Sequence, residues 1–231
     1  MRSMKVDMRT ITFYFDFISP YAYLAFEALP KSLQGISCSV NYQPVLFAGL
    51  LKHHGQLGPA EIPGKREWTY RQVLWQAREH GIALDLPESH PFNPLGLLRL
   101  ALACSPHQHP NRRICEAIFR HAWRGGAPAD DPDRLAHLTE KLQPQYSVDD
   151  LRVKEQLKTY TEQALARGVF GVPTLEVDGQ LFWGLDSLSM LKAYLQGDGS
   201  IPRDCELARR VRPGVKRGAA LNRVGRSGEP S

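Results

Sequence analysis

A serine and a proline stand at the point where the sequence changes from a strand-like to a helix-like pattern. In residues 11–17, ITFYFDF, hydrophobic residues occupy every second position, which is typical of a β-strand. Ser19 then has the side chain that helix N-caps prefer, and Pro20 has the fixed φ suited to the first helical position. A helix N-terminus presents free backbone N–H groups and the positive end of the helix dipole, which stabilise a phosphate, carboxylate or thiolate. The residue types leave open whether Ser19 only caps the helix or also serves an anion site.

Cysteine and histidine are the other side chains that could carry chemistry. The four cysteines form no C-x-x-C pair and show no metal-ligand spacing, so we expect small buried hydrophobic residues rather than a redox pair. They are Cys38, Cys104, Cys115 and Cys205. The histidines at His53, His54, His107 and His109 lack a cysteine or carboxylate at ligand spacing. We therefore expect them in exposed loops and predict no metal site.

Length and charge narrow the class of protein. A chain of 231 residues with 42% hydrophobic and 23% charged residues is typical of a globular protein with a sizeable core. It has no run of about 18 apolar residues and no signal-peptide centre at its N-terminus, so we expect a cytoplasmic protein without a membrane span. Residues 203–231 hold eight of the 29 cations and three of the 24 acids, which leaves 21 of each in residues 1–202. The net charge of +5 therefore lies in a basic tail that we expect to be disordered, which argues against a nucleic-acid partner.

The periodicity of the chain predicts the elements that position the serine. Residues 37–43 alternate again, after a helix that ends near Pro30 and Gly35. Strand, helix and strand within about 33 residues have the length of a right-handed βαβ unit with parallel strands. Residues 52–65, with three glycines and two prolines, predict a long loop, which is a candidate lid or binding loop.

The middle of the chain predicts an all-helical block over about residues 65–145. The expected helices are 68–81 with Gly81 as its terminating residue, 95–104, 112–124, and one that opens at Asp131-Pro132. Three prolines make residues 86–94 an extended connector. A further helix is expected at 148–167, and its predicted buried side holds Leu151, Leu157, Ala164 and Leu165.

The last patterned segment predicts a β-hairpin and a closing helix. Residues 174–177 and 180–183 flank Asp178-Gly179, a pair typical of a type I′ turn, and Asp186 is the expected cap of a helix over 187–195. The order βαβ, helical block, helix, ββα predicts an α/β, thioredoxin-like fold with an inserted all-helical domain. The expected boundaries are 10–64 and 146–197 for the thioredoxin-like domain, 65–145 for the insertion and 203–231 for the tail.

Two motifs carry a resemblance to a known family. The segment FDFISPYAYLA, together with GVFGVPT and DGQLFWGLDSLSML, resembles the 2-hydroxychromene-2-carboxylate isomerase family. The same segments are similar to the kappa-class glutathione transferases, and both groups lie in the DsbA-like branch of the thioredoxin superfamily. The likeness runs over about residues 11–197, so the basic tail lies outside it.

The resemblance implies a site for glutathione at the helix N-terminus. Redox members of that branch have a cysteine where this chain has Ser19, and Ser19 to Ala22 stand where C-x-x-C would be. A dithiol oxidoreductase is therefore not expected, because the chain offers neither an attacking nor a resolving thiol there. Glutathione would supply the sulfur, and Ser19 would be the catalytic residue that donates a hydrogen bond to its thiolate.

The resemblance also implies how the rest of glutathione is held. Val172-Pro173 matches a cis-proline corner whose preceding backbone pairs with the cysteinyl group. Asp186 and Ser187 match residues that hold the γ-glutamyl end. The basic residue near the glycyl end is Lys65, and Gln56 falls where the kappa-class pattern has an asparagine.

The resemblance also implies a substrate pocket beside the glutathione site, formed by Tyr21, Trp68, Trp75 and Asn93. Tyr21 follows the capping serine. Trp68, Gln72 and Trp75 stand where many isomerase-like members have a tyrosine, an acid and an arginine, so we expect a less charged, more aromatic pocket. Asn93 matches an asparagine of the pocket wall, although a turn residue before a proline is an equal interpretation of it.

Three functions follow as hypotheses. The first is a glutathione-dependent isomerase of the 2-hydroxychromene-2-carboxylate type, in which the thiolate adds reversibly to an aromatic oxo-acid or chromene substrate. The second is a kappa-class-like glutathione transferase, and the third is a non-catalytic thiol-binding or redox-accessory protein. The resemblance further implies a homodimer.

Overall fold

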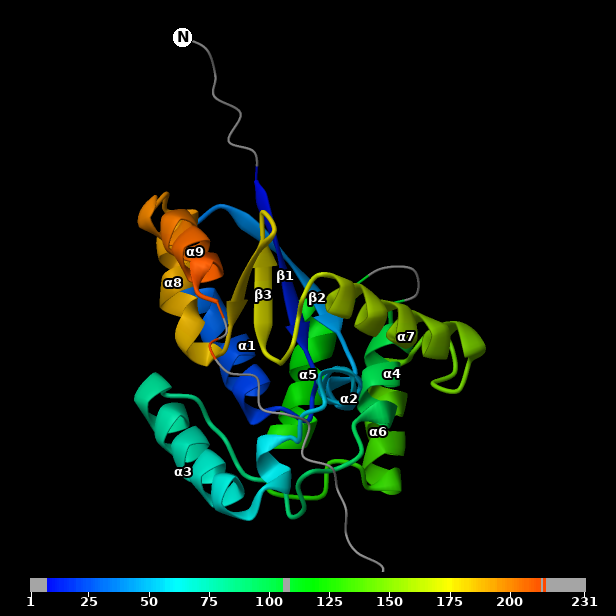
Figure 1. The fold of residues 1–231 in the computed structure, drawn as a ribbon. Helices are drawn as coiled ribbons and strands as arrows, with labels where there is room; N and C mark the ends of the chain where they lie inside the picture. Colours follow the sequence, from blue (N-terminus) through cyan, green and yellow to red (C-terminus); the bar gives the residue numbers. More distant parts are fainter. Residues whose placement is uncertain (1–7, 106–108, 213, 215–231) are drawn as a thin grey trace, which may run out of the picture.

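A four-stranded mixed sheet lies at the centre of the computed structural model, which describes residues 8–105, 109–212 and 214 (Figure 1). The strand order is β2-β1-β3-β4. Strand β1 (Arg9–Phe15) pairs in parallel with β2 (Cys38–Pro44), and α1 (Pro20–Ser32) connects the two. Strand β3 (Thr174–Val177) is antiparallel both to β1 and to β4 (Gln180–Trp183). The predicted βαβ unit and hairpin are confirmed.

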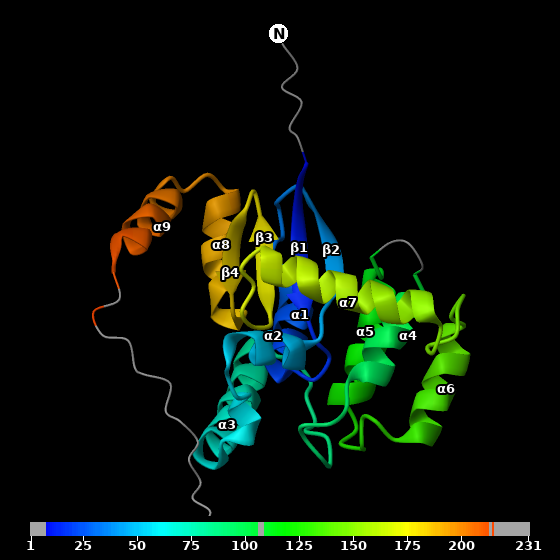
Figure 2. The ribbon, with the colours of Figure 1, turned by 45° about the vertical axis from the view of Figure 1, so that its right-hand side comes forward.

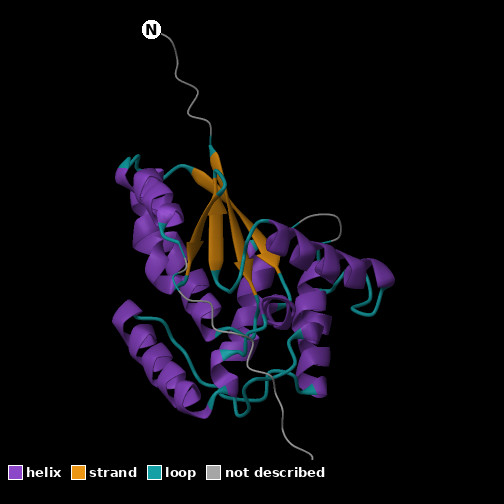
Figure 3. Ribbon diagram, in the orientation of Figure 1, coloured by secondary structure: helices purple, strands orange, loops and turns teal. Residues whose placement is uncertain are grey.

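Helices make up most of the remaining described chain. They are α2 (Phe47–His54), α3 (Pro63–His80), α4 (Leu95–Ala103), α5 (Arg112–Trp123), α6 (Pro132–Leu142), α7 (Leu151–Ala166), α8 (Leu188–Leu195) and α9 (Ser200–Arg210), with 3₁₀ turns η1 (Pro59–Glu61) and η2 (Leu185–Ser187). The strands, orange in Figure 3, are flanked by these helices. Among the described helices, none has the length and apolar character that a membrane crossing requires.

Both faces of the sheet are covered, so neighbouring residues of β1 enter two different cores. Phe13 and Phe15 pack into the large core with α1, α4, α5 and α8, whereas Tyr14 packs with Val45, Leu50 and Ala164 under α2 and α7. Figure 2 shows α7 lying across that second face. The alternation in β1 therefore separates two buried faces rather than a buried face from a solvated one.

The prediction of one long loop over residues 52–65 was wrong. Helix α2 continues to His54 and ends at Gly55, whose φ of 63° is left-handed, and α3 already begins at Pro63. The glycines and prolines of this segment mark the end of one helix and the start of the next. The irregular connection is therefore limited to residues 55–62 and contains η1.

Two further expectations need correction. Leu151, predicted to face inward, is 68% exposed because it is the first residue of α7, beside its cap Asp150. The tail was expected to lack regular structure from Arg203 onward, yet α9 extends to Arg210 and buries Ile201 against the large core. The tail residues 213 and 215–231 lie outside the described residues. Of the four free cysteines, Cys115 is buried as expected, and the other three are half-buried.

Candidate functional site

Ser19 is the N-cap of α1, as its sequence position predicts. Its Oγ accepts a hydrogen bond from the N–H of Ala22 at 3.2 Å, and Pro20 is the first helical residue. The hydroxyl also donates to the carbonyl oxygen of Val172 at 3.4 Å. This second bond is at the long limit for O–H···O contacts, so the hydroxyl proton is only weakly engaged. Ser19 thus caps its helix and still has a donor that another acceptor can take.

The residue that Ser19 contacts belongs to a cis-proline corner at the start of β3. The Val172–Pro173 peptide bond is cis, as the resemblance implied. The carbonyl oxygen of Pro173 accepts from the N–H of Gly184 at 2.9 Å, which ties the corner to the end of the hairpin. Segments more than 150 positions apart in the sequence therefore meet at the N-terminus of α1.

A cavity of about 280 Å³ opens beside Ser19 and Val172. Its walls come from the start of α1, from α2, η1 and α3, and from the connector before α4. Most of the lining is apolar, and no Lys or Arg side chain is among the described residues that line it. The polar members of the lining are Asp16, Ser19, Tyr21, Glu61, Thr69 and His90.

Asp16 is a fully buried acid at the wall of this cavity. Its Oδ1 accepts from the N–H of Ile18 at 3.1 Å, and its Oδ2 accepts from the N–H of Phe47, the first residue of α2, at 2.9 Å. Burial raises the pKa of the Asp16 carboxyl to about 7, although these backbone hydrogen bonds act in the opposite direction. Asp16 was not among the site residues predicted from the sequence. Its position, a polar residue just after a strand end and three residues before the capping serine, was the available signal.

His90 holds the same turn from the other side. Its Nε2 lies 2.8 Å from the carbonyl oxygen of Ile18, and because a carbonyl only accepts, Nε2 carries the proton. Nδ1 then accepts from the hydroxyl of Tyr70 in α3, also at 2.8 Å. Burial lowers the pKa of His90, which keeps the imidazole neutral at neutral pH. His90 was not predicted as a site residue, because the prolines in residues 86–94 indicated only an extended connector.

Tyr21 connects the cavity to α3. Its hydroxyl donates to Oε1 of Gln72 at 2.7 Å, and the phenol lines the cavity as predicted from the resemblance. Burial raises the pKa of Tyr21, and the nearby charge of Asp186 acts in the same direction. The exposed carboxylate of Asp186 therefore lies close enough to Tyr21 to act on it through space.

The two tryptophans predicted for the pocket lie elsewhere, which corrects that expectation. Trp68 and Trp75 are 59% and 56% exposed and share a groove on the outer face of α3. The inward face of this helix carries Thr69, Val73 and Ala77 instead. Thr69 takes the place in the cavity wall that the resemblance implied for Trp68.

Asn93 does not line the cavity either. Its Oδ1 accepts from the N–H of Leu95 at 3.1 Å, and its own N–H donates to Asp130. It is a turn residue at the start of α4, the alternative that the sequence had left open.

The remaining expected glutathione contacts lie around the cavity rather than in its lining. Gln56 and Lys65 are exposed, on either side in sequence of residues 58–61, which form one wall. Asp186 is not the cap of the closing helix: it lies in η2, and Ser187 is the N-cap of α8 without a side-chain capping bond. The Ser187 hydroxyl donates to the carbonyl oxygen of Gly184 at 2.8 Å.

Within the described part of the chain, no group of three or more His, Cys, Asp or Glu side chains could hold a metal ion. His53 and His54 belong to α2 rather than to a loop, and His109 stacks on Tyr160. His107 lies outside the described residues.

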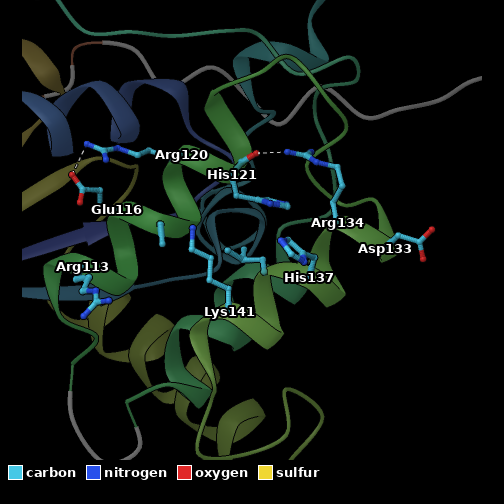
Figure 4. A pocket seen from close by; sticks show the side chains of 10 residues that line it. Arg113, Glu116, Arg120, His121, Asp133, Arg134, His137 and Lys141 are labelled. Carbon is cyan, nitrogen blue, oxygen red and sulfur yellow. Dashed lines mark hydrogen bonds and ion pairs between the residues drawn. The ribbon is translucent and has the colours of Figure 1, made fainter.

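A larger hollow of about 740 Å³ lies between α5 and α6 and shares no lining residue with the Ser19 cavity (Figure 4). Its lining is mostly charged, and two of its cations are already engaged. Arg120 pairs with Glu116 at 2.6 Å, and Arg134 donates to the carbonyl oxygen of His121 at 3.0 Å. This hollow is open and lies between two helices. The N-terminus of α6 borders it through Asp133 and Arg134, but the side chain of Asp131 already caps this helix by accepting from the N–H of Arg134 at 2.9 Å.

Comparisons with known proteins match most of the chain. The model of the DSBA-like thioredoxin domain matches residues 10–196. A 2-hydroxychromene-2-carboxylate isomerase of Sphingobium xenophagum is 29% identical over 194 residues, which cover 81% of this chain and 98% of the relative. Glutathione S-transferase kappa 1 of Caenorhabditis elegans is 39% identical over 214 residues, 83% of this chain and 93% of the relative. The solved structure of a 2-hydroxychromene-2-carboxylate isomerase superposes with a TM-score of 0.68 at 24% identity over 87% of this chain and 98% of the other, which supports the fold.

Proposed function

Because the chain belongs to the DSBA-like thioredoxin family, in the branch of the 2-hydroxychromene-2-carboxylate isomerases and kappa-class glutathione transferases, we propose that it is a glutathione-dependent enzyme. The observation that carries the proposal is Ser19, a capping serine that contacts a cis-proline corner at the wall of a mostly apolar cavity. No cysteine stands in the turn or in the first turn of α1, so the sulfur comes from outside the chain.

The residues around Ser19 fit a thiolate. The N-terminus of α1 offers free N–H groups and a positive dipole end. The Ser19 hydroxyl can turn its proton from Val172 toward the sulfur while its oxygen still accepts from Ala22, because a hydroxyl donates and accepts at once. Both effects stabilise the anion and lower the pKa of a thiol bound there.

Residues around the cavity would hold the ends of the tripeptide. The backbone at Val172, before Pro173, would pair with the cysteinyl group. Asp186 would face the α-amino group of the γ-glutamyl end, with Ser187 beside it. Lys65 and Gln56 would hold the glycyl carboxylate, and the exposure of both side chains leaves them free to reach it.

The reaction is proposed as an isomerisation of an aromatic oxo-acid or chromene substrate, by analogy with the relatives named 2-hydroxychromene-2-carboxylate isomerase. When bound, glutathione would supply a thiolate that adds to an electron-poor carbon and leaves again. A kappa-class transferase, in which the sulfur stays in the product, is the second candidate. It is favoured by the 39% identity to a kappa-class relative and by a cavity lining without a described cation for a substrate carboxylate.

The first experiment measures glutathione binding by titration calorimetry. The wild type is expected to bind glutathione, and the bound glutathione should show the ultraviolet absorbance of a thiolate near neutral pH. Ser19→Ala should keep binding but lose that absorbance, and Asp186→Ala should weaken binding about tenfold through the loss of one charged hydrogen bond. Asp131→Ala, which removes the cap of α6 and does not change a residue of the cavity lining, is the control and should change neither.

No binding by the wild type would exclude both enzyme proposals. Where binding is found, turnover of chromene carboxylates without consumption of glutathione identifies the isomerase, and consumption with chlorinated aromatic electrophiles identifies the transferase. Binding without either activity would leave a thiol-binding protein.

A further inference from the structure

Asp16 brings a second acidic group to the cavity that is proposed to hold a thiolate. It is 0% exposed, lies three residues before Ser19, and lines the same cavity. Its main-chain oxygen accepts from the N–H of Ser19 at 3.1 Å, so the two residues belong to one tight turn. A carboxylate and a thiolate this close, in a mostly apolar cavity, repel each other strongly because little water screens them.

No cation offsets the charge of Asp16 among the described residues. Its carboxyl oxygens contact only the backbone N–H groups of the turn and of Phe47 in α2. The titratable side chains that share the cavity are Tyr21 from α1, Glu61 from η1 and His90 from the connector. His90 is neutral, and the other two add no positive charge. The Asp16 carboxylate is therefore buried without a counter-ion.

We propose that Asp16 takes up the proton that the glutathione thiol loses when the thiolate forms beside Ser19. The inference rests on the proposed function. The balance is one proton: the S–H bond breaks, the electron pair stays on sulfur, and the carboxylate of Asp16 becomes a carboxylic acid. The net charge of the cavity is then the same before and after the thiol ionises.

The geometry of Asp16 suits this role. The two carboxyl oxygens have four lone pairs together, and the backbone N–H groups of Ile18, Phe47 and Phe17 engage at most three of them. A proton can therefore be added without breaking the bonds that hold the turn to α2. Burial already raises the pKa of the carboxyl to about 7, and a neighbouring thiolate would raise it further, so protonation is accessible near neutral pH.

The test counts the protons released when glutathione binds, by calorimetry in buffers of different ionisation enthalpy. At about pH 8 the wild type should release almost no proton for each thiolate formed, whereas Asp16→Asn should release about one. At about pH 6 Asp16 already carries its proton, so the wild type should also release about one for each thiolate formed. Glu61→Gln removes an exposed carboxylate from the same cavity and should leave the wild-type count unchanged.

A wild-type release of about one proton per thiolate at about pH 8, equal to that of Asp16→Asn, would overturn the inference and leave the proposed function intact. Absence of glutathione binding or of a thiolate band would instead refute the proposed function. If Asp16→Asn does not fold, the infrared difference spectrum of the wild type on adding glutathione at about pH 8 decides the matter. A new carbonyl band of a protonated, buried carboxyl supports the inference, and its absence refutes it.

Discussion

Two buried carboxyl groups beside the central strand are held in opposite ways. Glu176 in β3, next to Thr12 of β1, is bound by the hydroxyl of Tyr14 and by the guanidinium of Arg167, each at 2.6 Å. Asp16, directly after the end of β1, has only backbone N–H partners and lines a cavity. Of the two acids, the paired one is expected to stabilise the fold, and the unpaired one is available to exchange a proton.

The largest effect expected from this difference is a pH dependence of stability that belongs to Asp16. Its pKa in the folded state, about 7, is raised above the usual value of an aspartate, so the folded state binds more protons than the unfolded state between about pH 4 and 7. The free energy of unfolding therefore falls as the pH rises through this window. A shift of about three pKa units corresponds to about 4 kcal/mol.

Chemical denaturation across this pH range tests the point. In Asp16→Asn the unfolding free energy should no longer fall between about pH 4 and 7 because of this carboxyl. The difference in unfolding free energy between variant and wild type should therefore change with pH by up to about 4 kcal/mol. The lowered pKa of His90 acts in the opposite direction in both proteins and cancels in the difference. A pH-independent difference would mean that Asp16 does not differ from an ordinary surface carboxylate.

The second effect concerns the paired acid. Glu176→Ala leaves the Tyr14 hydroxyl buried without its acceptor and should destabilise the fold by about 2–3 kcal/mol. Arg167 is mostly exposed, so the loss of that ion pair contributes little. The double variant with Tyr14→Phe should recover part of the loss, because no unpaired hydroxyl remains. Destabilisation that is unchanged in the double variant would contradict the assigned Tyr14 bond.

The third effect separates two capping residues. Ser19→Ala and Asp131→Ala each remove one N-cap bond, from α1 and α6, and each should cost about 1 kcal/mol of unfolding free energy. Only Ser19→Ala should raise the pKa of bound glutathione, by about one unit or more, because only Ser19 lies at the cavity. The pKa of the bound thiol is measured from its thiolate absorbance as a function of pH. If the two variants shifted this pKa equally, the Ser19 hydroxyl would have no specific role at the sulfur.

Much of the fold followed from local patterns that agree with one another. The alternation before Ser19, the Asp178-Gly179 turn and the Asp131-Pro132 helix start each have one preferred backbone geometry, and each was confirmed. Asp16 could not be assigned from the same alternation. A polar position in a strand predicts a solvated face. In this sheet the second face is buried by α2 and α7, which come later in the sequence.

The assignment of Trp68 and Trp75 to the pocket was the other failure, and its cause is visible in the residues of α3. Only Thr69, Val73 and Ala77 of its 18 residues are buried, so the helix has a narrow apolar stripe and large residues on its outer side. Val73 and Ala77 indicate the buried face, but this apolar stripe is narrow, and nothing in it shows that Thr69 rather than Trp68 enters the cavity wall. Tertiary contacts, such as those of Tyr21 with Gln72 and Tyr70 with His90, orient the helix instead.

The smallest expected effect tests that orientation. Trp75→Ala removes a half-exposed ring that contacts the guanidinium of Arg78 on the outer face, so it should change the unfolding free energy by less than about 0.5 kcal/mol and leave the KM of any aromatic substrate unchanged. Thr69→Val, on the inner face of the same helix, changes the polarity of the cavity wall at nearly constant volume and should alter that KM. Steady-state kinetics of the two variants with one substrate would therefore assign the cavity to one face of α3. If Trp75→Ala raised the KM and Thr69→Val did not, the tryptophan face would be the substrate wall, and the cavity beside Asp16 and Ser19 would hold glutathione alone.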